Sequence, residues 1–135
     1  QCIHRSMLTV EVRLINKTLF FFDLQGPKSC ITTGRPDSSA TKTEVVDVVN
    51  GESCADLADF PLENYAAVGA NLHGTPVVCG GYSSGTYYQA CYKYTNTGWQ
   101  QFASMKEKRG YAAGITYKNK FHVFGGTDGS SIKDN

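Results

Sequence analysis

The chain has 135 residues, of which 41% are hydrophobic and 19% charged, and its formal net charge is +1. This composition is typical of a globular domain and excludes an extensively disordered chain, while the near-neutral charge gives no support for nucleic-acid binding. No apolar run approaches the ~20 residues that a membrane-spanning helix needs. Fourteen glycines and eight tyrosines favour an all-β protein rich in tight turns.

Residues 1–18 are an N-terminal extension, and the sequence leaves its place in the fold open. Residues 8–14 alternate between apolar and polar side chains, like a half-exposed strand, but they have no counterpart elsewhere in the chain. They are either an outer strand of another sheet or material foreign to the domain. Asn16 begins a glycosylation sequon, which is a weak indication of secretion.

Residues 19–57 predict a first four-stranded unit. Residues 19–24 are expected to form its inner strand. Residues 43–49 are rich in β-branched side chains and end at Asn50-Gly51, a strong signal for a tight turn.

Residues 58–102 predict a complete unit, and residues 103–135 the inner half of a third. Strands are expected over 65–72, 75–79, 87–95 and 99–102, and then over 111–117 and 120–124. Turn residues separate them, among them His73-Gly74 and Lys118-Asn119. Residues 82–87 are expected to be a flexible loop between two strands.

The three units are copies of one repeat. Gly80-Gly81 recurs as Gly125-Gly126 at an offset of 45 residues, and an earlier copy fits at an offset of 46, where Gly34 stands opposite Gly80. Four short antiparallel strands per ~45 residues is the blade of a β-propeller. The sequence therefore predicts about two and a half blades.

The repeat resembles the kelch repeat, in which a hydrophobic strand closed by Gly-Gly is followed by a Tyr and then a Trp. The matching residues are Gly80, Gly81, Tyr94, Trp99, Arg109, Gly125 and Gly126. The segment Val78-Cys79-Gly80-Gly81, with Cys91-Tyr92 further on, also resembles secreted kelch-like proteins of invertebrates. The resemblance covers residues 30–126 and implies a kelch-type β-propeller. In the first unit Gly34-Arg35 replaces the double glycine and Cys54 replaces the Trp, which puts the geometry of that blade in doubt.

These motif residues are expected to have structural roles. Adjacent glycines allow a sharp turn where a side chain would collide. The Trp covers apolar area near the outer strand, and the Tyr packs its ring while its hydroxyl reaches a polar partner.

No catalytic, cofactor-binding or metal-binding residue is assigned. Residues 81–85 match Gly-x-Ser-x-Gly, but a nucleophile elbow needs a helix after it, and residues 86–92 predict a strand. The histidines are far apart in sequence, and the acidic residues have no calcium-loop spacing. The residues considered are His4, His73, His122, Asp56, Asp59 and Glu63.

The cysteine count is five, which leaves at least one thiol without an intrachain partner. Cys79 ends one predicted strand and Cys91 begins the next, and neighbouring antiparallel strands can place such residues at disulfide distance. The alternative is two buried thiols. Cys30 and Cys2 are the candidate partners of Cys54, although Cys30 and Cys54 fall on strands that are not neighbours, and the pairing of these three cysteines stays open.

The leading hypothesis is a non-catalytic scaffold that binds another protein or a ligand through loops, because function in a propeller is found in its loops. The candidate binding residues are Tyr82, Ser83, Ser84, Thr86 and Tyr87, with 36–42 and 127–132 as equivalent loops. One alternative is a galactose-oxidase-like copper oxidase propeller, and another is a purely structural blade segment.

About two and a half blades cannot close a ring. We therefore expect the chain to be a fragment whose partners are further blades of the same protein or a second copy of itself. An extracellular or secreted location fits a disulfide, and a cytoplasmic location is the alternative.

Overall fold

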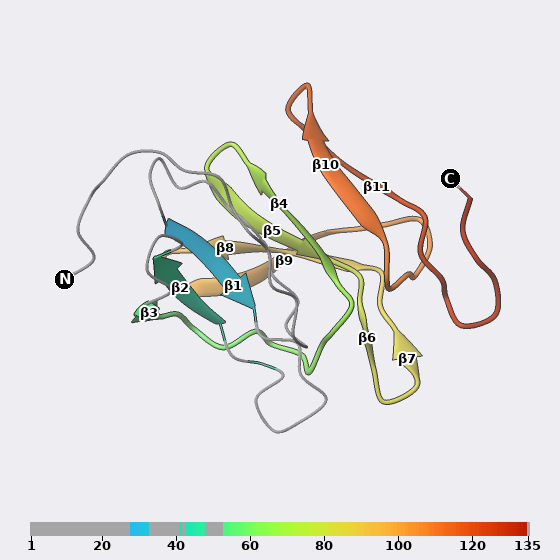
Figure 1. Ribbon diagram of the computed structural model, residues 1–135, viewed down its shortest axis with the longest axis horizontal. Helices are drawn as coiled ribbons and strands as arrows, with labels where there is room; N and C mark the ends of the chain where they lie inside the picture. The colour runs from blue at the N-terminus through green and yellow to red at the C-terminus, as the bar shows by residue number, and fades with distance from the viewer. Residues whose placement is uncertain (1–27, 33–40, 42, 48–52, 135) are drawn as a thin grey trace.

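The computed structural model describes residues 28–32, 41, 43–47 and 53–134 (Figure 1). Every regular element in this part of the chain is a β-strand, the pairings are antiparallel, and no helix there is long and apolar enough to cross a membrane. The predicted all-β class is confirmed for these residues. The strands are β1 Lys28–Thr32, β2 Thr43–Asp47, β3 Ser53–Asp56, β4 Val68–Leu72, β5 Thr75–Cys79, β6 Tyr82–Ser83, β7 Thr86–Tyr87, β8 Ala90–Thr95, β9 Gly98–Ser104, β10 Ala113–Tyr117 and β11 Lys120–Phe124.

The largest sheet has four strands in the order β4-β5-β8-β9. A tight turn at His73-Gly74 joins β4 to β5, and both turn residues have positive φ (54° and 77°). Such φ values suit a two-residue hairpin turn, whose twist matches that of the strands. Asn71 Oδ1 accepts a hydrogen bond from the Gly74 N–H at 2.7 Å, which stabilises the turn. β5 has the predicted bounds, whereas β9 extends beyond the strand predicted over 99–102 at both ends and runs past the predicted end of the unit at residue 102.

The segment between β5 and β8 differs from its prediction. Instead of a flexible loop and a strand beginning at Tyr87, β6 and β7 form a short hairpin, and β8 begins at Ala90. Ser84-Gly85 makes the turn of this hairpin with positive φ (48° and 85°). Tyr82 also exchanges two backbone hydrogen bonds with Tyr65, at 2.8 and 3.0 Å. Backbone pairing on both sides of β6 therefore orders this segment.

Both inner strands begin later than predicted. The sequence predicted strands from Tyr65 and from Tyr111, whereas β4 begins at Val68 and β10 at Ala113. The physical reason is the left-handed backbone of Ala66 (φ 56°) and Tyr111 (φ 57°), which interrupts an extended chain. The strand predicted over 120–124 is confirmed as β11.

A three-stranded sheet of order β1-β2-β3 precedes these elements. Cys30 lies on β1 and Cys54 on β3, and β2 separates the two strands, as the sequence predicted. Asp56 was predicted in a connection but ends β3. The predictions for residues 1–18, the inner strand at 19–24, the loop at 36–42 apart from Thr41, and Cys2 lie outside the described residues.

The 45-residue repeat is visible in the backbone. The bridge between Tyr65 and Tyr82 has an equivalent between Gly110 and Thr127, each with two backbone hydrogen bonds. Positive φ values recur at the same offset, in the pairs Ala66 and Tyr111, His73 and Lys118, Gly80 and Gly125, and Gly81 and Gly126. The sequence repeat is therefore a structural repeat over residues 65–127.

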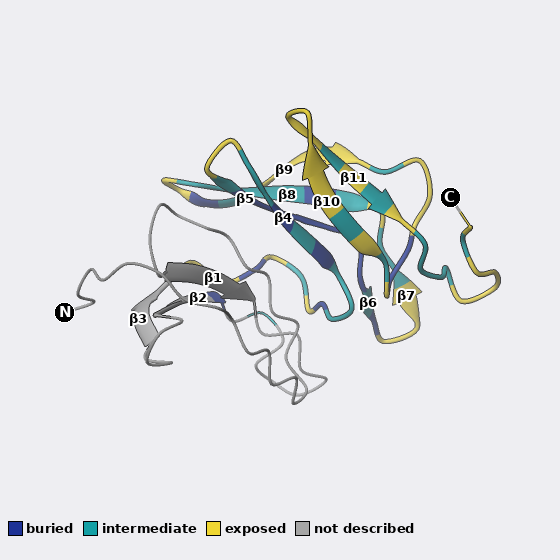
Figure 2. Cartoon of the chain, turned by 45° about the horizontal axis from the view of Figure 1, so that its top comes forward, coloured by how far each residue is buried: buried dark blue, intermediate teal, exposed yellow. Residues whose placement is uncertain are grey.

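Two hydrophobic clusters form the core. One contains Phe60 and Val78, packed against Tyr92 and Trp99. The other joins the central sheet to the hairpin β10–β11 and contains Val68, Val77, Cys79 and Cys91, packed against Leu72, Met105, Ala112, Phe121 and Val123. In Figure 2 buried positions lie on β4, β5 and β8, whereas β10 and β11 are exposed or intermediate. The hairpin β10–β11 thus covers one face of the central sheet.

Candidate binding rim

The double glycines lie where the backbone leaves no room for a side chain. A Cβ on Gly81 would overlap the Asn64 amide, and one on Gly126 would overlap the Gly110 carbonyl oxygen. The Asn64 amide donates a hydrogen bond to the Gly80 carbonyl at 2.9 Å. These contacts hold the two double glycines against the segments that precede β4 and β10.

Arg109 donates a hydrogen bond to the double glycine of the third unit, as Asn64 does to that of the second unit. Its Nη1 donates to the Gly125 carbonyl at 3.0 Å, and Asn64 and Arg109 are each 7% exposed and stand 45 residues apart. Arg109 was among the motif residues predicted from the sequence, whereas Asn64 was not. The repeat offset was the signal that could have found Asn64.

Tyr94 and Trp99 hold the central sheet against the segment before it. Their rings contact each other edge to face at 5.2 Å, and Trp99 also contacts the Phe60 ring at 5.1 Å. The Tyr94 hydroxyl accepts a hydrogen bond from the Ala58 N–H at 3.2 Å, and the Trp99 indole N–H donates to Thr43 Oγ1 at 3.2 Å. In the described residues both side chains therefore pack and hydrogen-bond at the junction between units.

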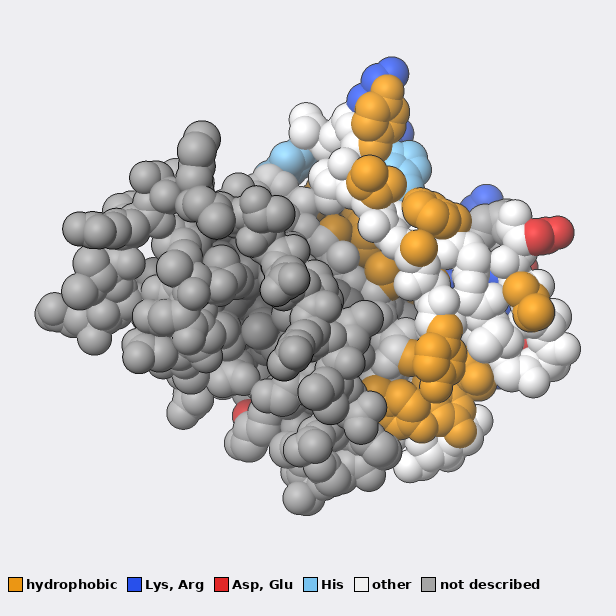
Figure 3. All heavy atoms as spheres, in the orientation of Figure 1, with side chains coloured by type: hydrophobic (Ala, Val, Ile, Leu, Met, Phe, Trp, Pro, Cys, Tyr) orange, Lys and Arg blue, Asp and Glu red, His pale blue; other side chains and the backbone are white. Residues whose placement is uncertain are grey.

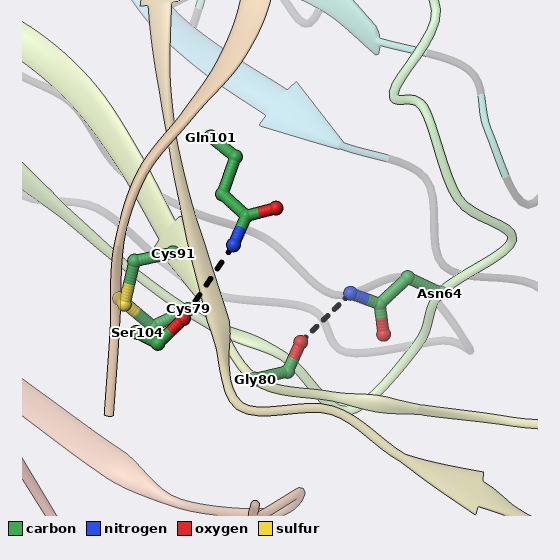
Figure 4. The surroundings of a disulfide bond; sticks show 6 residues. All are labelled: Asn64, Cys79, Gly80, Cys91, Gln101 and Ser104. Carbon is green, nitrogen blue, oxygen red and sulfur yellow. Dashed lines mark hydrogen bonds between the residues drawn. A yellow bond between two sulfur atoms is a disulfide. The ribbon is translucent and has the colours of Figure 1, made fainter. Parts of the chain in front are cut away.

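A disulfide joins Cys79 and Cys91, as the sequence predicted. The two residues stand directly opposite each other on β5 and β8, with their Cα atoms 4.1 Å apart (Figure 4). Both are buried, and they form part of the face that the hairpin β10–β11 covers. The bond links the two middle strands of the central sheet.

The five candidate binding residues all lie on the hairpin β6–β7 or in its turn. Ser84 and Thr86 are exposed, whereas Ser83 is buried at 7% exposure. The Tyr82 ring contacts the Tyr65 ring at 5.1 Å and the Tyr87 ring at 4.6 Å. The sequence analysis placed Tyr65 within a strand and did not connect it with this loop.

The phenols of Tyr65 and Tyr87 have raised pKa values and stay protonated at neutral pH. Partial burial raises the pKa of Tyr65, and the neighbouring phenols of Tyr82 and Tyr111 raise it further. Burial likewise raises the pKa of Tyr87, with contributions from Tyr111, Tyr82 and the Asp128 carboxylate. Each hydroxyl therefore remains available as a hydrogen-bond donor.

Asp128, in the loop equivalent to β6–β7, has its carboxylate oxygens occupied. One accepts hydrogen bonds from Ser130 and Ser131, and the other forms an ion pair with Lys133 at 2.9 Å. The hydrogen bond from Lys133, followed by those from Ser130 and Ser131, lowers the pKa of the Asp128 carboxyl. The same pair raises the pKa of Lys133, which also contacts Glu107. These charges fix the shape of the loop.

The other candidates are not brought together. His73 lies in the β4–β5 turn, whereas His122 lies on β11 beside the Tyr117 ring. Asp59 and Glu63 lie between β3 and β4, and no group of three or more His, Cys, Asp or Glu side chains that could hold a metal ion occurs in the part of the chain that the structure describes. In the Gly-x-Ser-x-Gly segment, β7 follows the turn where a nucleophile elbow would need a helix.

A groove of about 660 Å³ lies between the end of β9 and the hairpin β10–β11. Met105, Phe121 and Val123 line it together with the buried disulfide. Met105 stands 45 residues after Phe60, and Phe60 packs against Tyr92 and Trp99. The groove therefore corresponds to the space that aromatic side chains fill in the preceding unit.

No protein-family profile and no curated protein sequence matches the chain. Among solved structures it is similar to YjhT, with a TM-score of 0.68, 16% sequence identity, and an alignment that covers 82% of this chain and 39% of the YjhT chain. At this identity the similarity shows the fold alone. The chain therefore spans about two fifths of the length of the YjhT chain.

Proposed function

We propose that the chain is a segment of a kelch-type β-propeller that acts as a non-catalytic scaffold and binds a partner protein through the rim bearing β6–β7. The backbone repeat, the close approach of Gly81 to Asn64, and the packing of Tyr94 on Trp99 support a kelch-type unit. The similarity to YjhT, a propeller-like fold, supports the same assignment. Further blades of the same protein are the natural partners of the exposed faces.

The observation that carries the binding function is the ordered, tyrosine-rich hairpin. Many protein-binding loops are enriched in Tyr, Ser and Gly. The phenol rings supply contact area, and the small residues adapt to form hydrogen bonds. Here the Tyr82 and Tyr87 rings pack against each other, and Ser84 and Thr86 are exposed between them. A surface prepared in this way loses little conformational entropy on binding.

We further propose an extracellular location, which the Cys79–Cys91 disulfide supports because such bonds persist in oxidising compartments. The competing function is a copper oxidase of the galactose-oxidase type. It would require stoichiometric copper and peroxide production by the purified protein, and finding both would overturn the binding proposal.

Site-specific photocrosslinking tests the proposed function. A benzophenone amino acid replaces Thr86 on the hairpin or, as the matched control, Thr97 in the β8–β9 turn at the opposite end of the strands; both residues are exposed. We expect one defined protein adduct from position 86, absent from position 97, and weaker binding of that purified partner by Tyr82→Ala. Identical adducts from both positions would contradict the proposal.

A further inference from the structure

Four tyrosines from three segments of the chain meet at the rim that carries β6–β7. Tyr82 and Tyr87 come from the hairpin and Tyr65 from the segment before β4, whereas Tyr111, from the segment before β10, is held there by the hydrogen bond from its N–H to the Ala66 carbonyl. Figure 3 shows a patch of hydrophobic side chains over β6–β7 at the lower right of the molecule. We call these four residues the tyrosine cluster.

The tyrosine cluster is held rigidly from beneath. A Cβ on Gly129 would lie 2.8 Å from the Tyr87 ring and one on Gly110 would lie 3.2 Å from it, so the ring is wedged between two glycine backbones. Tyr65 and Tyr82 are joined by two backbone hydrogen bonds and by the edge-to-face contact of their rings. The surface is therefore formed before any ligand arrives.

Tyr111 departs from the repeat in a way that the fold does not require. Its left-handed backbone (φ 57°) is shared by Ala66 in the preceding unit, so the conformation belongs to the repeat. A bulky side chain is strained in this conformation, and the Tyr111 side chain is 63% exposed. Strain at an exposed aromatic residue is a feature of binding sites rather than of packing.

We propose that the tyrosine cluster binds an extended, proline-rich segment of a partner protein; this inference rests on the proposed binding function. The Tyr65 and Tyr82 rings meet edge to face at 5.1 Å, and the Tyr82 and Tyr87 rings are tilted against each other at 4.6 Å, so the three rings form a ridged aromatic surface on which prolyl rings pack. A polyproline II segment has no internal hydrogen bonds, so its carbonyl oxygens are free to accept hydrogen bonds from phenol hydroxyls.

Two other ligand classes fit the cluster less well. A sugar needs planar groups that accept hydrogen bonds from its hydroxyls, and the carboxylate beside Tyr87 belongs to Asp128, whose two oxygens already bind Ser130, Ser131 and Lys133. A quaternary ammonium ion needs a cage between rings, and here the neighbouring rings are in contact. An uncharged extended peptide remains the best match.

Titration of the whole chain with fluorescent decaproline tests the inference. A glycine-serine peptide of the same length and a cello-oligosaccharide are the comparison probes. We expect saturable binding of decaproline that Tyr111→Ala weakens about tenfold. Because Ala66 already occupies the equivalent position, Tyr111→Ala is expected to fold. Tyr117→Ala, at an exposed tyrosine on β10, is the matched control and should leave the affinity unchanged.

Each alternative outcome is decisive. Decaproline binding no tighter than that of the glycine-serine peptide, or equally weakened by Tyr117→Ala, would overturn the inference. Oligosaccharide binding that depends on Tyr111 while decaproline fails would also overturn it, yet would leave a binding function for the rim. A position-specific crosslink from residue 86 without decaproline binding would likewise refute only the proline-rich ligand.

Discussion

The hairpins β4–β5 and β10–β11 have the same length and the same kind of turn, yet their equivalent faces have opposite surroundings. Ala70 and Cys79 are 8% and 3% exposed, whereas Ile115 and Phe124, 45 residues later, are 56% and 46% exposed. The hairpin β10–β11 covers the first face, and no described residue covers the second in the same way. The burial of a hairpin is thus decided by the unit that follows it.

The largest expected effect concerns the shared double glycine. Gly81→Ala should lower the free energy of unfolding by more than about 3 kcal/mol, because the new Cβ overlaps the Asn64 amide and φ is +105°. Gly85→Ala is the control, since its φ is +85° but its Cβ would meet no atom within 4 Å, and it should cost only about 1 kcal/mol. Urea unfolding of both variants measures the difference. Equal losses would show that backbone strain, and not the close approach, requires Gly81.

A smaller loss is expected from removing the disulfide on the covered face. The Cys79→Ala, Cys91→Ala double variant loses a crosslink that closes a short loop, since the two residues are 12 positions apart. The chain-entropy model puts this loss at about 3 kcal/mol, before any cavity effect. The urea midpoint should fall while the strand signal of the chain in circular dichroism is retained. An unchanged midpoint would mean that the bond adds nothing to the stability of the central sheet.

Arg109 tests whether the two units are equivalent. Arg109→Ala leaves the Gly125 carbonyl without its donor and should cost about 2 kcal/mol. Arg109→Asn recreates the residue that serves Gly80 in the preceding unit, and it should restore about half of that stability. Thermal or urea unfolding compares the three proteins. If Asn is as destabilising as Ala, the units differ at this position in more than sequence.

Much of this architecture was predictable because it depends on local chemistry. His73-Gly74 and Gly80-Gly81 adopt the positive φ values that tight turns need. Positive φ values recur 45 residues later in the next unit. Cys79 and Cys91 were predictable because they bracket two neighbouring strands. The strand starts were not, since the left-handed backbone of Ala66 and Tyr111 carries no composition signal.

The tyrosine cluster was predictable only in part. Tyr82 and Tyr87 were singled out because they flank a Ser- and Gly-rich turn. Tyr65 and Tyr111 join them through backbone pairing between segments distant in sequence, and such contacts leave no periodicity in the sequence. Asn64 was missed although it stands 45 residues before Arg109, because its role is defined by the glycine backbone that it contacts and its residue type differs from that of Arg109.

The smallest expected effect separates the two hairpin faces. Ile115→Ala, on the exposed face, should change the free energy of unfolding by less than about 0.5 kcal/mol. Val77→Ala, on the covered face, should cost about 2 kcal/mol because Val77 is 1% exposed. A loss at Ile115 as large as that at Val77, measured by urea unfolding, would show that β10–β11 is also covered.

Hydroxyl-radical footprinting of the dilute chain tests the central claim, that each unit is buried by the next, most directly. We expect fast oxidation of Tyr117 and Phe124, which are 58% and 46% exposed, and slow oxidation of Val68 and Val77, which lie beneath β10–β11 and are 8% and 1% exposed. Protection of Tyr117 and Phe124 as complete as that of Val68 and Val77, in a protein shown to be monomeric, would contradict the account.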